Sequence, residues 1–129
     1  MSFESLKETW ANPSYYDHAQ FGHEIIGELL GYPEKLKEAE KQVMAAKKRV
    51  DEIKNKMETK RYSLLASGVI DGKNAEVREA QIALKLGEET GALLSAKENL
   101  DEAEFYFKQI EIEYRTLLAI SRVLGNEPN

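Results

Sequence analysis

The sequence predicts an all-α fold, an antiparallel coiled-coil hairpin in which one long C-terminal helix is backed by two shorter helices. Apolar residues recur at alternating spacings of three and four on both sides of a glycine-containing loop, which is typical of helices that pack along each other. Charged residues make up 32% of the 129 residues, and three prolines are present, as in long helical proteins. Residues 34–67 carry ten Lys/Arg against six Asp/Glu, and residues 74–124 carry six against ten. Opposite charge favours pairing of these two segments.

The length predicts one helical domain over residues 1–129, beginning with an N-terminal helical segment, residues 1–31. Phe3, Leu6 and Trp10 lie at helical spacing within its first eleven residues. Ser14 predicts the N-cap of a second helix, over residues 15–30, with the acidic side chain of Asp17 favourably placed in its first turn.

The long helical hairpin is predicted over residues 33–67 and 74–124. Pro33 suits the first turn of a helix, because its missing N–H is not needed there. Gly68 suits the left-handed position after a helix, and Asn74 is expected to cap the helix that follows. The apolar seam consists of Leu36, Ala39, Val43, Ala46, Val50, Ile53 and Met57, then Leu93, Ala96, Leu100, Ala103, Phe107, Ile110, Tyr114 and Leu117.

A hairpin with this loop brings together residues whose numbers sum to about 141. That register sets Met57 against Leu84, Ile53 against Gly87 and Val50 against Gly91. Each glycine inside a helix costs up to about 1 kcal/mol of stability relative to alanine. The glycines are therefore expected to allow close approach of the helices, which would offset this cost. The same register extends the last helix beyond Pro33, where the 15–30 helix is expected to cover it.

Near the loop, Ile82 and Leu86 widen the apolar arc of the last helix. A wide apolar arc can pack against more than one neighbouring helix. The sequence therefore predicts a homo-oligomer, with hairpins assembling into a bundle.

The residue types needed for most catalytic and metal sites are absent or scattered. The chain has no cysteine and two histidines, His18 and His23, whose spacing of five sets them on different sides of a helix. We therefore expect no metal, no cofactor and no enzymatic activity. No apolar run is long enough to span a membrane, and the first residues do not resemble a signal peptide, so a cytoplasmic location is expected.

The basic residues of the 33–67 helix form the one cluster that could contact nucleic acid. The alternative is that they pair with the acidic helix that follows, and the net charge of −5 opposes binding to nucleic acid. The cluster consists of Lys47, Lys48, Arg49, Lys54, Lys56, Lys60 and Arg61.

Aromatic residues gather at the end of the hairpin remote from the loop. Three consecutive aromatics cannot all enter one seam, so at least one is expected to be exposed or covered by a partner. Packing against residues 1–30 and binding to another protein are both open for this group, and aromatic side chains dominate the energetics of protein interfaces. The candidate protein-interaction residues are Trp10, Tyr16, Phe21, Phe105, Tyr106, Phe107 and Tyr114.

The turn segment carries a family resemblance. Residues 72–80 read Gly-Lys-Asn-Ala-Glu-Val-Arg-Glu-Ala. This stretch resembles the Gly-Lys-Asn-Ala-Glu-x-Arg-x-Ala turn of small uncharacterised helical-hairpin proteins of tailed bacteriophages and prophages, a resemblance that covers residues 34–124. It implies a phage origin, near replication and recombination genes, and a location in the cytoplasm of a bacterial host; it supplies no catalytic residue.

The leading hypothesis is thus a non-enzymatic scaffold or adaptor protein that self-associates and docks another protein, linked to phage replication or recombination. One alternative is an accessory nucleic-acid-binding protein that uses the basic face of the 33–67 helix. A further alternative is a small phage inhibitor of a host enzyme.

Overall fold

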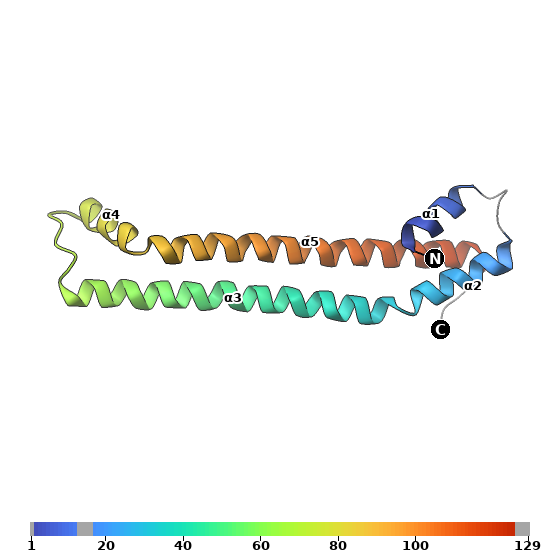
Figure 1. Cartoon of the computed structure of the whole chain (residues 1–129), viewed down its shortest axis with the longest axis horizontal. Helices are drawn as coiled ribbons and strands as arrows, with labels where there is room; N and C mark the ends of the chain where they lie inside the picture. Colours follow the sequence, from blue (N-terminus) through green and yellow to red (C-terminus); the bar gives the residue numbers. More distant parts are fainter. Residues whose placement is uncertain (1, 13–16, 126–129) are drawn as a thin grey trace. The chain divides into compact units, whose positions relative to one another are not determined.

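The computed structural model describes residues 2–12 and 17–125, and the regular structure in these ranges is α-helical (Figure 1). The contacts divide the chain into two compact units, residues 1–41 with 105–129 (unit 1) and residues 42–104 (unit 2). Helices α3 and α5 contribute to both units. The helices are α1 (Phe3–Ala11), α2 (His18–Leu29), α3 (Tyr32–Ser67), α4 (Ala75–Lys85) and α5 (Gly87–Val123).

The helices of unit 1 begin at side-chain caps. The side chain of Ser2 accepts a hydrogen bond from the Ser5 N–H, and Asp17 Oδ1 accepts one from the Ala19 N–H at 2.8 Å. Asp17 is therefore the N-cap of α2. The sequence analysis had instead placed Asp17 in the first turn of a helix that begins at residue 15. The predicted cap, Ser14, lies outside the described residues.

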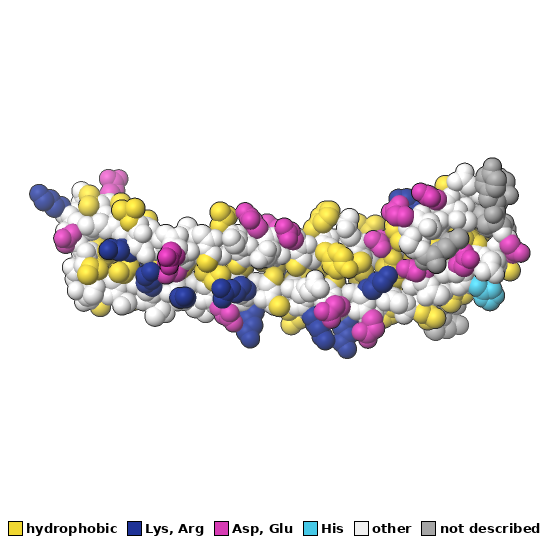
Figure 2. Space-filling view, in the orientation of Figure 1, with side chains coloured by type: hydrophobic (Ala, Val, Ile, Leu, Met, Phe, Trp, Pro, Cys, Tyr) yellow, Lys and Arg dark blue, Asp and Glu magenta, His cyan; other side chains and the backbone are white. Residues whose placement is uncertain are grey.

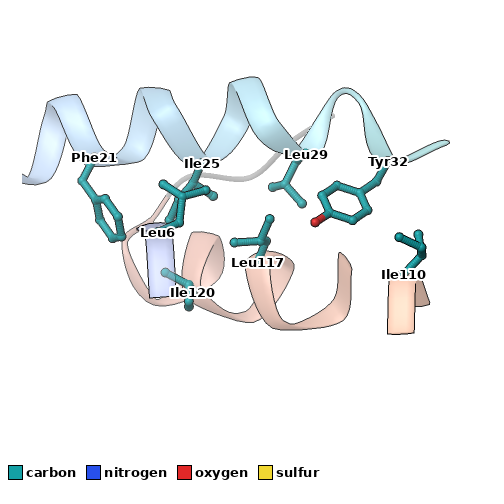
Figure 3. Packing of buried hydrophobic residues seen from close by; sticks show 8 residues of the cluster. All are labelled: Leu6, Phe21, Ile25, Leu29, Tyr32, Ile110, Leu117 and Ile120. Atoms are coloured by element: carbon teal, nitrogen blue, oxygen red, sulfur yellow. The ribbon is translucent and has the colours of Figure 1, made fainter. Parts of the chain in front are cut away.

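The core of unit 1 is formed by side chains from α1, α2, the start of α3 and the end of α5 (Figure 3). Burial of each large apolar side chain contributes about 1.5–3 kcal/mol. The prediction that the second helix covers the C-terminal part of the last helix is therefore confirmed. The buried residues are Leu6, Phe21, Ile25, Leu29, Tyr32, Ile110, Leu117 and Ile120.

Unit 2 is a helical hairpin held by a smaller core. Val50 and Ile53 of α3 pack with Ala96 of α5, and Met57, Leu93 and Leu100 flank them. At the turn, Gly68 has φ +78°, and Asn74 Oδ1 accepts a hydrogen bond from the Val77 N–H at 2.9 Å. These observations confirm both local predictions. Such features are predictable because each depends on the neighbouring backbone only.

The helix predicted over residues 74–124 is in fact two helices. Leu86 leaves the helical conformation at φ −98° and ψ 13°, so α4 ends at Lys85 and α5 begins at Gly87, with a visible change of direction (Figure 1). Two causes act together. Ile82 and Leu86 are buried at the bend, and glycine at residue 87 has a low helix propensity.

Beyond the bend, the break also corrects the predicted register and the glycine contacts, whereas before the bend the pair of Arg61 with Glu79 keeps to the predicted sum of about 141. Lys60 is paired with Glu89 of α5, two turns beyond its predicted partner. A Cβ added to Gly87 or Gly91 would meet no atom within 4 Å, so neither glycine permits a close approach. Leu84 is 83% exposed, because the bend turns Ile82 and Leu86 inward in its place.

Candidate interaction surfaces

Two of the predicted interaction aromatics pack against each other inside unit 1. The rings of Trp10 and Phe21 stack with centroids 6.5 Å apart and an interplanar angle of 13°. Phe21 is 1% exposed and Trp10 is half-buried. The alternative of intramolecular packing therefore holds for Phe21, which belongs to the core and offers no surface to a partner.

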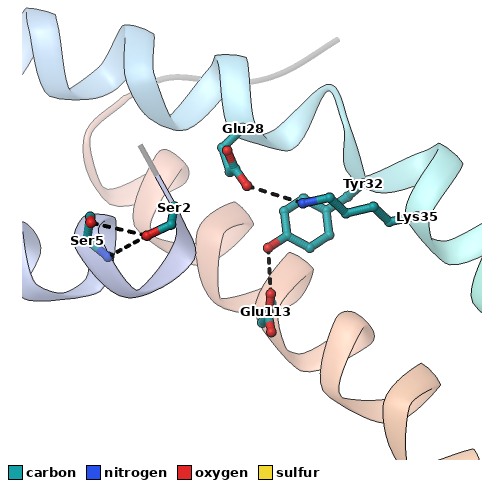
Figure 4. A network of polar contacts seen from close by, with 6 residues as sticks. All are labelled: Ser2, Ser5, Glu28, Tyr32, Lys35 and Glu113. Carbon is teal, nitrogen blue, oxygen red and sulfur yellow. Dashed lines mark hydrogen bonds and ion pairs between the residues drawn. The ribbon is translucent and has the colours of Figure 1, made fainter.

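Tyr114 is tied to the core through Tyr32. Their rings stack at 5.6 Å, and the buried Tyr32 hydroxyl donates a hydrogen bond to Glu113 Oε1 at 2.8 Å (Figure 4). Lys35 Nζ lies 4.7 Å from the Tyr32 ring centroid and 3.3 Å from the Glu28 carboxylate. These contacts join α2, α3 and α5, so this polar cluster fixes the packing of unit 1.

The electrostatics of this cluster do not suit acid–base chemistry. Burial, and then the hydrogen bond to Glu113, raise the pKa of the Tyr32 phenol above its ordinary value. The phenol therefore stays protonated at neutral pH and acts as a fixed donor. The sequence did not single out Tyr32, although its place beside Pro33 at a helix start indicated a residue that joins two helices.

The remaining predicted aromatics differ in exposure. Phe107 is half-buried, whereas Phe105 is 65% exposed and Tyr106 is 45% exposed. Tyr16 lies outside the described residues. The expectation that consecutive aromatics cannot all enter the seam is confirmed, and Phe105 and Tyr106 are the ones left accessible.

The structure adds exposed apolar residues that the sequence reading missed. Leu94, Ile112 and Val123 of α5 have more than half of their surface accessible. Hydrophobic side chains are accordingly visible on the surface over this helix (Figure 2). The signal in the sequence was present but weak, since Ile112 and Val123 fall outside the spacings of three and four that define the seam.

The basic cluster of α3 is partly neutralised inside unit 2. Lys60 Nζ lies 2.7 Å from Glu89 Oε1, and Arg61 forms a two-pronged ion pair with Glu79, with one contact at 2.9 Å. These contacts join α3 to α5 and to α4. For Lys60 and Arg61 the alternative of pairing with the acidic segment is therefore confirmed.

These ion pairs shift the titration of their carboxyl groups. The hydrogen bond from Lys60 lowers the pKa of Glu89, and the hydrogen bond from Arg61 lowers the pKa of Glu79. The Glu79 contact correspondingly raises the pKa of Arg61. Both carboxylates thus favour the folded hairpin when ionised.

Four lysines of the cluster have no such partner. No ion pair joins Lys47, Lys48, Lys54 or Lys56 to another described residue, while Arg49 lies 3.9 Å from Glu52 on its own helix. With about 100° of rotation per residue, the cluster is distributed over both flanks of the seam instead of forming one stripe. A phosphate-binding face on α3 would therefore use part of the cluster.

The loop between α3 and α4 is closed by its own contacts. The Gly72 N–H donates to Gln81 Oε1 at 2.9 Å, and the Arg78 guanidinium donates to the Gly72 carbonyl at 3.1 Å. Among the described residues, no group of three His, Cys, Asp or Glu side chains could hold a metal ion. Within the same ranges, no helix is long and apolar enough to cross a bilayer.

Comparison of the chain with family models, curated proteins and solved structures gives no match. The candidate surfaces therefore stand on their geometry: exposed apolar residues of α5, and unpaired lysines of α3.

Proposed function

We propose that this protein is a non-enzymatic scaffold or adaptor that self-associates and docks a second protein. The observation that carries the proposal is the adjacent pair Phe105 and Tyr106, which stays exposed while neighbouring aromatics stack inside unit 1. Large aromatic side chains bury much area at little cost in side-chain entropy, which makes them effective interface anchors. From the resemblance of the turn to phage proteins, we infer that the partner belongs to a phage replication or recombination machine.

The surroundings of the pair support a docking role. The Tyr32 hydrogen bond to Glu113 and the Tyr114 stack fix α5 next to the pair. A rigid helix presents anchors at little cost in conformational entropy. The exposed aromatics are therefore available to a partner without refolding of unit 1.

The test is affinity capture of the tagged chain from bacterial cells, with the wild type compared with Tyr106→Asp. Tyr62→Asp is the matched control, because Tyr62 is also exposed but lies on α3 in unit 2. We expect a stoichiometric partner that is lost with Tyr106→Asp and kept with Tyr62→Asp. No partner for the wild type, or equal capture by both variants, would refute the adaptor function.

A second candidate function is accessory nucleic-acid binding. It is favoured by Lys47, Lys48 and Lys54, which form no ion pair within the described residues, since phosphate contacts require free cationic side chains. Lys56 forms no ion pair either, but it lies close enough to Glu89 to help lower the pKa of that carboxyl group. The acidic net charge of −5 acts against it.

Fluorescence polarisation with a single-stranded oligonucleotide at several salt concentrations tests this candidate. Charge reversal with Lys54→Glu and Lys56→Glu is expected to weaken binding and to lower the salt slope by about one for each lysine that binds a phosphate in the wild type. Lys37→Glu with Lys41→Glu is the matched control on the same helix. Binding that is absent, or that ignores the first pair of changes, rules the candidate out.

A further inference from the structure

The loop between α3 and α4 contains the pair Asp71 and Gly72, and neither aspartate nor asparagine precedes a glycine anywhere else in the sequence. In such a pair the backbone nitrogen of the glycine can attack the side-chain carboxyl carbon of the aspartate. Glycine permits this approach more readily than other residues, because it has no Cβ and its backbone adopts a wider range of conformations. Asp71 is exposed, so its carboxyl group is open to water. The loop therefore contains the groups needed for a spontaneous rearrangement at residue 71.

One side chain of α4 holds both reacting groups. The Gly72 N–H donates a hydrogen bond to Gln81 Oε1 at 2.9 Å, and Gln81 Nε2 donates one to Asp71 Oδ1 at 2.8 Å. This orientation of the amide satisfies both partners, because a backbone N–H can only donate and a carboxylate can only accept. Gln81 thus bridges the nitrogen and the carboxyl group that the nitrogen would attack.

The backbone at Gly72 is also packed tightly against the first turns of α4. The Arg78 guanidinium donates a hydrogen bond to the Gly72 carbonyl at 3.1 Å. A Cβ added to Gly72 would lie 2.7 Å from Val77 Cγ1 and 2.9 Å from the Arg78 backbone nitrogen. The loop must therefore leave α4 before the Gly72 nitrogen can turn onto the carboxyl carbon of Asp71.

We propose that Asp71 is a site of isoaspartate formation, and that the contacts of Gln81 suppress this reaction in the folded protein. The Gly72 nitrogen bonds to Cγ of the protonated Asp71 carboxyl group and the Cγ–OH bond breaks. The hydroxyl leaves with the proton of the nitrogen as one water molecule. Water then opens the resulting succinimide at either carbonyl, so the product is aspartate or isoaspartate and no other reactant is consumed. Gln81 opposes the first step, because the N–H that must lose its proton is engaged as a donor and points toward Gln81.

Isoaspartate would alter the loop itself. It adds one carbon atom to the main chain at residue 71 and leaves the free carboxyl group on Cα. The longer backbone does not fit the close packing of Gly72 against Val77 together with both Gln81 contacts. A modified loop is therefore released from α4, and the rate of modification reports how often the loop opens. This inference goes beyond the proposed adaptor function and is independent of it, because no docking residue of α5 takes part.

The reaction can be measured by ageing the full-length protein at neutral pH, below its unfolding temperature, and digesting it with trypsin. Cleavage after Arg61 and Lys73 releases residues 62–73. The isoaspartate form of this peptide has an unchanged mass, separates by chromatography and is located by electron-transfer fragmentation. Two hydrogen bonds of ordinary net strength correspond to a protection of about tenfold to a hundredfold. We expect the folded wild type to react slower by such a factor than the same protein unfolded in guanidinium chloride, and equal rates in the two states would overturn the inference.

Gln81→Ala tests the assignment to this side chain and should react about tenfold or more faster than the folded wild type. Glu79→Ala is the matched control on the same helix, because it removes the ion pair with Arg61 but neither of the Gln81 contacts, and it should react like the wild type. Circular dichroism should show the same helix content for all three proteins. Gln81→Glu keeps an acceptor for the Gly72 N–H but no donor for Asp71, so its rate should lie between those of the wild type and Gln81→Ala. If Gln81→Ala loses helix content, Gln81→Glu decides in its place. Wild-type rates in the folded Gln81 variants, or an equal increase in Glu79→Ala, would overturn the inference.

Discussion

The bend between α4 and α5 can be tested by a pair of alanine substitutions two residues apart. Ile82 is 2% exposed and Leu84 is 83% exposed, although the predicted seam placed Leu84 inside the hairpin. Truncation of a buried isoleucine costs about 2–5 kcal/mol, and the lower end applies to a short helix beside a loop that can relax. Ile82→Ala should therefore lower the free energy of unfolding by about 2–3 kcal/mol. Leu84→Ala should change it by about 0.5 kcal/mol or less, because it removes no buried contact.

Urea unfolding followed by far-UV circular dichroism measures both variants against the wild type. With a slope of about 2 kcal/mol per molar urea, the Ile82→Ala midpoint should fall by about 1 M or more, while the Leu84→Ala midpoint stays nearly constant. Equal shifts, or a larger shift for Leu84→Ala, would show that the continuous seam is the correct register and that α4 and α5 are not bent at Leu86.

Three further predictions follow from single contacts. Tyr32→Phe removes the buried hydrogen bond to an α5 carboxylate and should destabilise the protein by about 1–2 kcal/mol in urea unfolding. Gly72→Ala should destabilise the turn by about 1–3 kcal/mol in the same assay, because its Cβ would lie 2.7 Å from a valine methyl group, whereas Gly91→Ala, with open space, should stabilise slightly. The pKa of Glu89 is lower in the folded state because of its pair with Lys60. The ionised pair therefore stabilises the fold above pH 4.5, and this stabilisation is lost as the pH falls through the lowered pKa. In urea unfolding at several pH values, Lys60→Met should lose less stability on acidification than the wild type does.

Each of these three predictions has an outcome that would contradict it. A Tyr32→Phe protein as stable as the wild type would mean that water satisfies the carboxylate equally well. A Gly72→Ala protein that matches Gly91→Ala would mean that the turn relaxes freely. An unchanged acid loss in Lys60→Met would mean that other carboxyl groups control it.

Local features of the fold were predictable because they depend on a few neighbouring residues. Asn74 caps α4, Gly68 takes the left-handed conformation, and α3 ends at Ser67 as predicted, since each needs only backbone geometry and one side chain. The all-α class was equally predictable from the alternation of apolar residues. These signals do not require knowledge of what the helix packs against.

The bend at Leu86 could not be predicted in the same way. Gly87 alone does not stop a helix, because its cost of about 1 kcal/mol is easily exceeded by packing of the flanking turns. Two apolar stripes compete in this region, and only tertiary packing decides that Ile82 is buried and Leu84 exposed. Once that choice reverses, the pairing of every later residue shifts, as the contact between Lys60 and Glu89 shows.

The candidate surfaces show the same limit. Sequence composition identified the aromatic and basic groups but could not separate the buried Phe21 from the exposed Phe105, since both are apolar residues at helical positions. Lys54 and Lys60 are likewise the same residue type on one helix, yet Lys60 alone of the two has a carboxylate within reach. Exposure and pairing are properties of the packed chain, so the structure was needed to reduce each group to its accessible members.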